Sequence, residues 1–288
     1  MSATGISVII PTHNRRETLV RAVESVQAQT FRDWDLLIVD DGSHDGTDRE
    51  WSNPGDPRIR YLRTEHRGVS AARNLGIQQA RFPWIAFLDS DDTWLPKKLE
   101  AQLTALESHP GYLAVHSDEI WIRRGRRVNP KKIHRKYGGW VYRYSLPRCV
   151  ISPSSILIAR ELLDRCGMFD EDFPVCEDYE LWLRMFARHP ICFVDRPLLV
   201  KTGGHADQLS RSTWGLDRFR VRAMVKTVES GVLSLQQEAW TAAEIARKSD
   251  ILAGGSEKRG RTETGRYYRR LGEFWSERHR KRIRRLSF

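Results

Sequence analysis

The residues Asp89-Ser90-Asp91-Asp92 carry three carboxylates directly after the apolar run from Trp84 to Leu88. Hard divalent cations prefer oxygen ligands of this kind, and a cation held there can neutralise charge on a departing diphosphate. The same residues also suit a polar strand end at which Asp92 caps the next helix. Taken alone, the cluster does not separate a metal site from a structural turn.

Two further polar clusters also follow apolar runs: Pro11-Thr12-His13-Asn14 and Asp40-Asp41-Gly42-Ser43. A carboxylate at such a position can accept a hydrogen bond from a nucleobase N–H or a ribose hydroxyl, and His13 can stack on a base. The alternatives are a histidine with a structural role and a turn in which Ser43 or Asp45 caps a helix. The proline ends its strand in either case.

Two pairs of adjacent polar residues complete the candidate chemistry, Arg73-Asn74 and Glu177-Asp178. Arg73 can meet a phosphate or a ribose if its helix points toward the same edge as the three clusters. An arginine on a solvated helix face is the simpler alternative. Glu177-Asp178 opens an expected helix, where acidic side chains also interact favourably with the helix dipole.

Apolar periodicity indicates how these residues are positioned. Through about the first 116 residues, short apolar runs alternate with segments of helical spacing. The expected strands are Ile6–Ile10, Trp34–Val39, Ile59–Leu62, Trp84–Leu88 and Tyr112–His116, and the expected helices include Val69–Ala80 and Lys97–Ser108. This alternation predicts an α/β fold with a largely parallel sheet flanked by helices. Because ligands bind outside the carboxyl ends of such strands, the three clusters are expected at one edge of the sheet.

The second half of the chain is less regular and shows no internal repeat. A basic stretch runs from Arg123 to Lys136. Strands are expected at 154–158 and 191–194, and helices at 179–188 and 218–228. Residues 254–265, rich in glycine, serine and charge, are expected to form a linker.

In the first half, Asn14 and Glu17 have the spacing of a capping box.

Composition limits the class of protein. The chain has 288 residues, of which 40% are hydrophobic and 30% charged, so a sizeable core is expected in a soluble protein. No apolar run is long enough to span a bilayer. The first residues lack the features of a secretory signal, which makes the cytoplasm the expected compartment. The four cysteines are too widely spaced for a zinc knuckle and are expected to be reduced thiols.

The formal charge of +11 is concentrated near the C-terminus. Between Glu257 and Phe288, twelve lysines and arginines stand against four glutamates, which gives this segment a net charge of +8. Aromatic and aliphatic residues are interspersed among them, as in helices that lie on an anionic membrane surface. The alternative is a helix that packs on the main domain and exposes a basic face. Nucleic acid is not an expected partner, because no recognised motif accompanies the charge.

The motifs together resemble the family 2 glycosyltransferases of the GT-A fold. The resemblance covers about the first hundred residues and depends on the order and spacing of four motifs, each weak alone: Val8-Ile-Ile-Pro-Thr-His-Asn14, Val39-Asp-Asp-Gly-Ser43, Ala72-Arg-Asn74 and Phe87-Leu-Asp-Ser-Asp-Asp92. It implies a GT-A-like, Rossmann-type mostly parallel sheet and a nucleotide-diphosphate sugar donor bound with Mg²⁺ or Mn²⁺. A uridine diphosphate sugar is the expected donor.

The resemblance also assigns roles on the donor side. Asp41 would contact the base, with Asp40 beside it. Asp89 and Asp91 would form the DxD pair, in which Asp91 is closest to the metal. Asp92 would help to hold the metal. The remaining residues expected to bind the nucleotide sugar are Pro11, Thr12, His13, Asn14, Arg73 and Ser90. His13 departs from the family, in which a tyrosine is frequent at this position.

In the second half, Cys176-Glu-Asp-Tyr-Glu-Leu-Trp-Leu-Arg184 resembles the ED motif of the family. Asp178 would be the catalytic base that takes the proton of the acceptor hydroxyl, and Glu177 would bind the acceptor. His205, in the segment 203–210, would complete the metal site or touch the diphosphate, or would be a loop histidine. Trp121 and Trp140 are candidates for stacking on a sugar, whereas Trp182 has the spacing of a core residue.

The sequence thus predicts a GT-A-like domain over residues 1–230 and a helical, basic C-terminal extension over 231–288. The nucleotide-binding half would cover about 1–116 and the acceptor half about 117–230. The expected activity is inverting, metal-assisted sugar transfer to a hydroxyl of a carbohydrate or lipid-linked acceptor, in synthesis of a surface polysaccharide or glycoconjugate. The expected location is cytoplasmic, with peripheral attachment to the inner membrane face. A sugar-phosphate nucleotidylyltransferase and a non-catalytic binding protein of the same fold are the alternatives.

Overall fold

The computed structural model of the chain describes residues 5–129, 131–204 and 213–286. In its first part strands alternate with helices, as the apolar periodicity predicted. These elements are β1 (Ile6–Thr12), α1 (Arg16–Gln27), β2 (Trp34–Asp41), α2 (Thr47–Trp51), β3 (Ile59–Thr64), α3 (Val69–Gln79), β4 (Trp84–Phe87), β5 (Thr93–Trp94), α4 (Lys98–Glu107), β6 (Ala114–Arg123) and β7 (Arg126–Val128).

The second part contains fewer strands and ends in three helices. Its elements are η1 (Lys132–His134), α5 (Tyr142–Ser145), η2 (Pro153–Ser155), β8 (Ile156–Ala159), α6 (Arg160–Cys166), α7 (Glu177–Phe186), β9 (Cys192–Gly203), α9 (Leu216–Glu229), α10 (Leu235–Glu257) and α11 (Thr262–Leu286). The helices expected at 179–188 and 218–228 are thus confirmed as α7 and α9. The strand expected at 191–194 is much longer, because β9 pairs with both β6 and β5.

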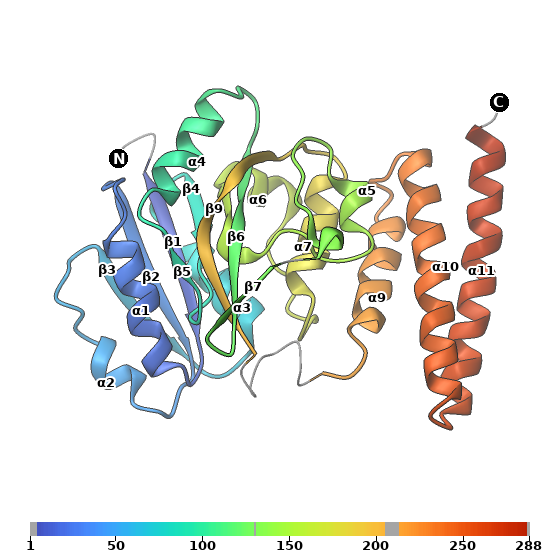
Figure 1. Cartoon of the computed structure of the whole chain (residues 1–288), viewed down its shortest axis with the longest axis horizontal. Coiled ribbons are helices and arrows are strands. Elements are labelled where there is room, and N and C mark those ends of the chain that lie inside the picture. The colour runs from blue at the N-terminus through green and yellow to red at the C-terminus, as the bar shows by residue number, and fades with distance from the viewer. Residues whose placement is uncertain (1–4, 130, 205–212, 287–288) are drawn as a thin grey trace.

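The strands form one sheet in the order β3-β2-β1-β4-β8-β6-β9-β5, with β7 paired to β6 (Figure 1). The pairs among β1, β2, β3 and β4 are all parallel. The strand β8 is antiparallel to both β4 and β6, so β6 runs in the same direction as β4, and β9 runs parallel to β6. Most strands therefore share one direction, and their carboxyl ends lie along the same edge.

Helices cover both faces of the sheet. Alternation along β1 sends Ile9 to one face and its neighbours Val8 and Ile10 to the other. Ile9 belongs to a buried cluster with residues of α3, α6 and α7, whereas Val8 and Ile10 belong to one with residues of α1 and α4. This arrangement confirms the mostly parallel α/β fold with flanking helices that the sequence predicted.

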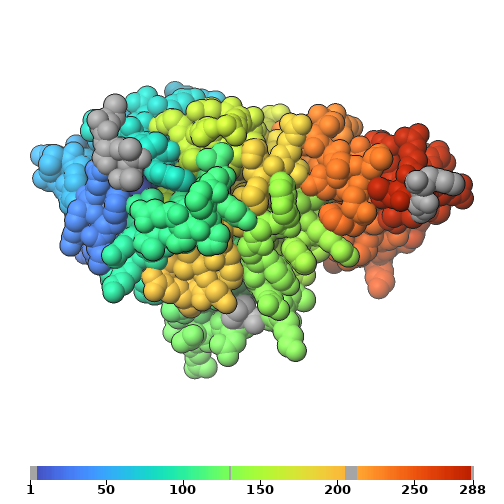
Figure 2. All heavy atoms as spheres, turned by 90° about the horizontal axis from the view of Figure 1, so that it is seen from above, coloured from blue at the N-terminus to red at the C-terminus, as the bar shows by residue number. Residues whose placement is uncertain are grey.

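The C-terminal helices α10 and α11 pack side by side at the end of the molecule opposite α2 (Figures 1 and 2). The expected linker at 254–265 is wrong, because α10 continues to Glu257 and α11 begins at Thr262. Two glycines of α11 permit its close packing on α10: a Cβ on Gly265 would lie 2.9 Å from Cγ of Glu257, and a Cβ on Gly272 would lie 2.9 Å from Oδ1 of Asp250. The helical nature of the extension is confirmed.

The expected capping box at the start of α1 is also wrong. Arg15 is the N-cap residue and makes no side-chain capping bond. Asn14 instead adopts a left-handed conformation with φ of 52°, which frees its side chain to bond elsewhere. Within the described residues, no helix is both long and apolar enough to cross a membrane.

Candidate active site

The polar residues after β1 and β2 lie together, as expected for neighbouring parallel strands. Thr12 pairs with Asp40 in the strand register. The Asn14 amide N–H donates to Oγ of Ser43 at 2.9 Å, and the His44 amide N–H donates to Oδ1 of Asn14 at 2.8 Å. The hydroxyl of Thr12 is buried and has no hydrogen-bond partner among the described residues, which leaves it available to a ligand.

Both carboxylates at the end of β2 are already hydrogen-bonded within the protein. Asp40 is fully buried and accepts from the Ser43 amide N–H at 2.8 Å and from the Tyr61 hydroxyl. Asp41 accepts from the amide N–H groups of Arg67 at 2.7 Å and Gly68 at 2.9 Å. Asp41 therefore fixes the loop between β3 and α3. Its contact with a base remains a prediction.

His66 is a residue of this edge that the sequence motifs did not reveal. Its ring stacks on His13 with a centroid distance of 4.1 Å, and its Nδ1 lies 2.8 Å from Oδ2 of Asp41. His66 thus covers a face of the ring that was expected to stack on a nucleobase. In the part of the chain that the structure describes, these three side chains form one group whose ligand atoms all lie within 4.8 Å of one another. The position of His66 after β3 was the available signal, since the carboxyl end of β3 belongs to the same edge.

The acidic cluster after β4 is anchored by a serine and a strand from the second half. The Ser154 hydroxyl donates to Oδ2 of Asp92 at 2.7 Å and accepts from the Asp89 amide N–H at 3.0 Å. The Thr202 amide N–H donates to Oδ1 of Asp92 at 2.9 Å. Asp92 does not cap the next helix, because α4 begins only at Lys98. Ser90 is buried in the turn between these aspartates.

Negative charge is crowded in this cluster. Burial and the neighbouring carboxylates raise the pKa of Asp92 to about 8. Burial and Asp89 likewise raise the pKa of Asp91. For Asp89 the Arg73 guanidinium outweighs the effect of burial and holds the pKa below its usual value. The Nζ of Lys201 lies 3.8 Å from Asp92. An oxygen-rich cluster with excess negative charge fits a hard divalent cation.

Arg73 joins this acidic cluster to the second half of the site. Its Nη2 donates to Asp89 at 2.8 Å and its Nη1 to Glu177 at 2.6 Å, and the residue is 3% exposed. The helix that carries it packs tightly on β1, because a Cβ on Gly76 would lie 2.4 Å from Cγ2 of Ile9. Arg73 is therefore not on a solvated helix face. Its expected contact with the donor stays a prediction.

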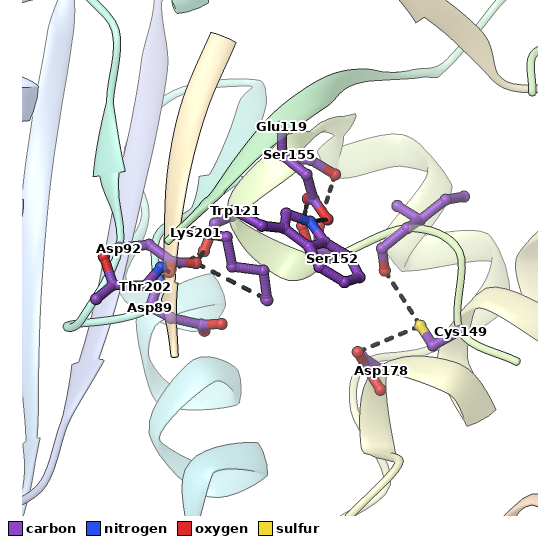
Figure 3. Close-up of polar contacts among 12 residues, drawn as sticks. Asp89, Asp92, Glu119, Trp121, Cys149, Ser152, Ser155, Asp178, Lys201 and Thr202 are labelled. Atoms are coloured by element: carbon purple, nitrogen blue, oxygen red, sulfur yellow. Dashed lines mark hydrogen bonds and ion pairs between the residues drawn. The ribbon is translucent and has the colours of Figure 1, made fainter. Parts of the chain in front are cut away.

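Glu177 and Asp178 have different surroundings although they are adjacent. Burial and Asp178 raise the pKa of Glu177 to about 7, against the opposing effect of Arg73. Oδ1 of Asp178 accepts from the Tyr179 amide N–H at 2.6 Å, and Oδ2 accepts from the Cys149 thiol at 3.3 Å. Figure 3 shows Asp178 on the opposite side of the site from Asp89, with Trp121 between them.

The segment from Cys149 to Ser155 contacts both the acidic cluster and Asp178, and sequence reasoning missed its role. Besides Cys149 and Ser154, Ser152 donates to Oε2 of Glu119 at 2.6 Å. The carbonyl of Ile151 accepts from the indole of Trp182 at 2.9 Å. A run of small polar residues before a strand was the only signal, and such runs are typical of ordinary loops.

The three tryptophans have three different environments. Trp182 is 2% exposed and lies in the core, as its spacing predicted. Trp140 is 63% exposed. Trp121 lies in the site, where its indole donates to Glu119 at 2.7 Å (Figure 3). Nζ of Lys136, the last residue of the basic stretch, lies 3.2 Å from Glu119 and outweighs burial to lower the pKa of that carboxyl to about 2.

The proposed third metal ligand, His205, lies outside the described residues. The strand that precedes it ends close to the acidic cluster, through Lys201 and Thr202. The structure thus brings together the clusters after β1, β2 and β4, Arg73 and the Glu177-Asp178 pair, and it leaves the role of His205 as a prediction.

A solved relative shares this architecture and defines it as a GT-A fold. The structure of S. aureus TarS 1–349 in complex with UDP-GlcNAc superposes with a TM-score of 0.64 and 20% identity, over 87% of this chain and 71% of that one. The family model for glycosyl transferase family 2 matches residues 7–156, just over half of the chain. The chain belongs to glycosyl transferase family 2, as its four motifs predicted.

Curated relatives agree with this assignment. The Escherichia coli UDP-Glc:alpha-D-GlcNAc-diphosphoundecaprenol beta-1,3-glucosyltransferase WfgD is 32% identical over 197 residues, which cover 66% of this chain and 73% of WfgD. An uncharacterized glycosyltransferase of Rickettsia felis is 34% identical over 197 residues, 68% of this chain. The chain spans about a third of the length of that relative.

Proposed function

We propose that this protein transfers a sugar from a nucleotide-diphosphate donor, with uridine diphosphate as the nucleotide, to a hydroxyl group of a saccharide acceptor. The observation that carries the proposal is the double ion pair of Arg73, with Asp89 at 2.8 Å and Glu177 at 2.6 Å. It links the acidic cluster to the start of α7, and Asp178, the next residue of α7, would face the donor sugar. The UDP-GlcNAc bound to TarS supports the choice of nucleotide.

The acidic cluster would hold Mg²⁺ or Mn²⁺ through Asp91 and Asp89, with His205 as a candidate third ligand. The cation would neutralise charge on the departing diphosphate. The carboxylate oxygens suit such a cation, and the unfavourable crowding of Asp89, Asp91 and Asp92 supports its presence. Arg73 and Lys201 would balance the remaining negative charge.

Asp178 would act as the general base. Its carboxylate has no ion-pair partner within the described segments, whereas Glu177 is paired with Arg73. Asp178 would take the proton of the acceptor hydroxyl as that oxygen attacks the sugar carbon. A single displacement from the side opposite the diphosphate inverts the anomeric centre. Glu177 would support the acceptor side of the site.

The acceptor we propose is lipid-linked, and the product a surface polysaccharide or glycoconjugate. The name of WfgD specifies a diphosphoundecaprenol-linked acceptor for that protein. Trp121 would stack on a sugar of the acceptor, with its indole N–H fixed by Glu119. Two exposed aromatic residues, Tyr267 and Phe274, lie two helical turns apart on one face of α11.

That face of α11 would attach the protein to an anionic membrane. Exposed Arg266 and Arg270 flank Tyr267, and cations beside aromatics favour an anionic lipid surface. Sedimentation with vesicles containing phosphatidylglycerol is expected for the wild type and to be lost in Arg266→Glu/Arg270→Glu. Arg165→Glu, at an exposed position of α6, is the control and should sediment normally. Equal sedimentation of all three proteins would contradict membrane attachment through α11.

Donor hydrolysis tests the proposed reaction against its alternatives. With Mn²⁺ and a panel of nucleotide sugars, we expect slow release of nucleoside diphosphate, and Asp91→Ala should reduce it at least about 100-fold. A nucleotidylyltransferase would instead release pyrophosphate or nucleoside monophosphate, and a binding protein would release nothing. The Pro11–Asn14 turn already disfavours the nucleotidylyltransferase, which would be expected to have a glycine-rich loop there.

A further inference from the structure

The thiol of Cys149 lies between two acceptors beside the proposed base. Its Sγ is 3.3 Å from Oδ2 of Asp178 and 3.2 Å from the carbonyl oxygen of Ile151 (Figure 3). A thiol has one hydrogen to donate, so it serves only one of these oxygens at a time, and its sulfur can also accept a hydrogen bond.

A partner of Asp178 must be able both to donate and to accept a hydrogen bond. Before the reaction its carboxylate only accepts hydrogen bonds, but after taking a proton it becomes a donor. Its other described contact, the Tyr179 amide N–H on Oδ1, can only donate. A lysine or arginine at the position of Cys149 would favour the charged carboxylate and oppose proton uptake.

We propose that Cys149 is a positioning residue that satisfies Asp178 in both of its protonation states. Before transfer the S–H donates to Oδ2 of Asp178. When the acceptor hydroxyl gives its proton to Oδ2, the S–H rotates to the Ile151 carbonyl and the sulfur accepts the new O–H. The acceptor oxygen then bonds to the sugar carbon as the diphosphate leaves. The inference rests on the proposed role of Asp178 as base.

The surroundings keep the sulfur in the thiol form. Burial and the nearby Asp178 carboxylate raise the pKa of Cys149 well above its ordinary value. The residue is only partly exposed, and its neighbours along the chain are fixed by the contacts of Ile151 and Ser152. The hydrogen needed for the rotation is therefore present throughout the neutral pH range.

Infrared spectroscopy of the S–H stretch tests the contact without any substrate. The band lost in Cys149→Ser identifies the Cys149 thiol. In the wild type we expect it at the low frequency of a thiol that donates to a carboxylate, and Asp178→Asn should move it to higher frequency. A band that Asp178→Asn leaves in place would overturn the proposal.

Kinetic measurements then test the role of Cys149 in catalysis. The probe is the nucleotide sugar that the wild type hydrolyses fastest. Cys149→Ala should reduce turnover about tenfold with unchanged donor affinity, whereas Cys149→Ser should remain within about threefold of wild type. Cys166→Ala, on α6 outside the site, is the control. Equal losses in the serine and alanine variants, or no loss in alanine, would overturn the role. If Asp178→Asn itself keeps full turnover, the proposed base fails instead.

Discussion

The nucleotide edge (residues 11–14, 40–43 and 66–68) and the base side (residues 149–155 and 177–178) hold their carboxylates differently. Asp40 and Asp41 accept hydrogen bonds from backbone amides of nearby turns. Glu177 and Asp178 are held by the side chains of Arg73 and Cys149, which lie 104 and 29 residues away in sequence. Asp40 and Asp41 also contact the side chains of Tyr61 and His66, and Asp178 also accepts from the Tyr179 amide. The base side differs in that one of its carboxylates has a thiol partner, which can change its hydrogen bond when the carboxylate takes up a proton.

Removal of Arg73 should have the largest effect on stability, because it couples the two regions. Arg73→Ala leaves the buried Glu177 and the partly buried Asp89 without their cation, and we expect a loss of about 3 kcal/mol in the free energy of unfolding. Urea denaturation measures this loss. Arg67→Ala, which breaks the exposed pair with Glu171, is the control and should cost less than about 1 kcal/mol. Similar values for the two variants would show that Arg73 does not hold the regions together.

A smaller effect is expected where α3 packs on β1 and thereby places Arg73. Gly76→Ala would force a Cβ against Ile9 and should destabilise the fold by about 1–3 kcal/mol. Gly254→Ala, in α10, meets nothing within 4 Å and should be neutral or stabilising by up to about 1 kcal/mol. Thermal unfolding of both variants checks the difference, and an undisturbed Gly76→Ala would contradict the tight packing of α3.

The smallest effect is expected at Trp121. Trp121→Ala should raise the KM for the acceptor about tenfold and leave donor hydrolysis unchanged, because the substitution removes the ring that would stack on the acceptor sugar and its bond to Glu119. Trp121→Phe keeps a ring but loses the bond to Glu119, and an intermediate KM is expected. Trp140→Ala, at an exposed site, is the control. An acceptor KM that is the same in all variants would remove Trp121 from the acceptor side.

The difference between strand-end residues and residues held by distant elements also explains which parts of the site could be predicted from the sequence. The clusters after β1, β2 and β4 were predicted to meet because parallel strands bring their carboxyl ends to one edge. Cys149, Ser152 and Ser154 were missed because their partners come from distant elements and depend on tertiary packing. His66 was missed because β3 carries no acidic motif. The linker expected at 254–265 failed because glycine, serine and charged residues are also tolerated near the ends of two long helices that pack on each other.

The role of Asp178 is the central claim, and Asp178→Asn tests it most directly. The substitution keeps the size of the side chain and its acceptor for the Tyr179 amide, but removes the basic oxygen. With donor affinity measured by calorimetry and sugar transfer measured in the same preparation, we expect unchanged donor binding and a loss of transfer of about 100-fold or more. Transfer at the wild-type rate with normal donor binding would contradict the account.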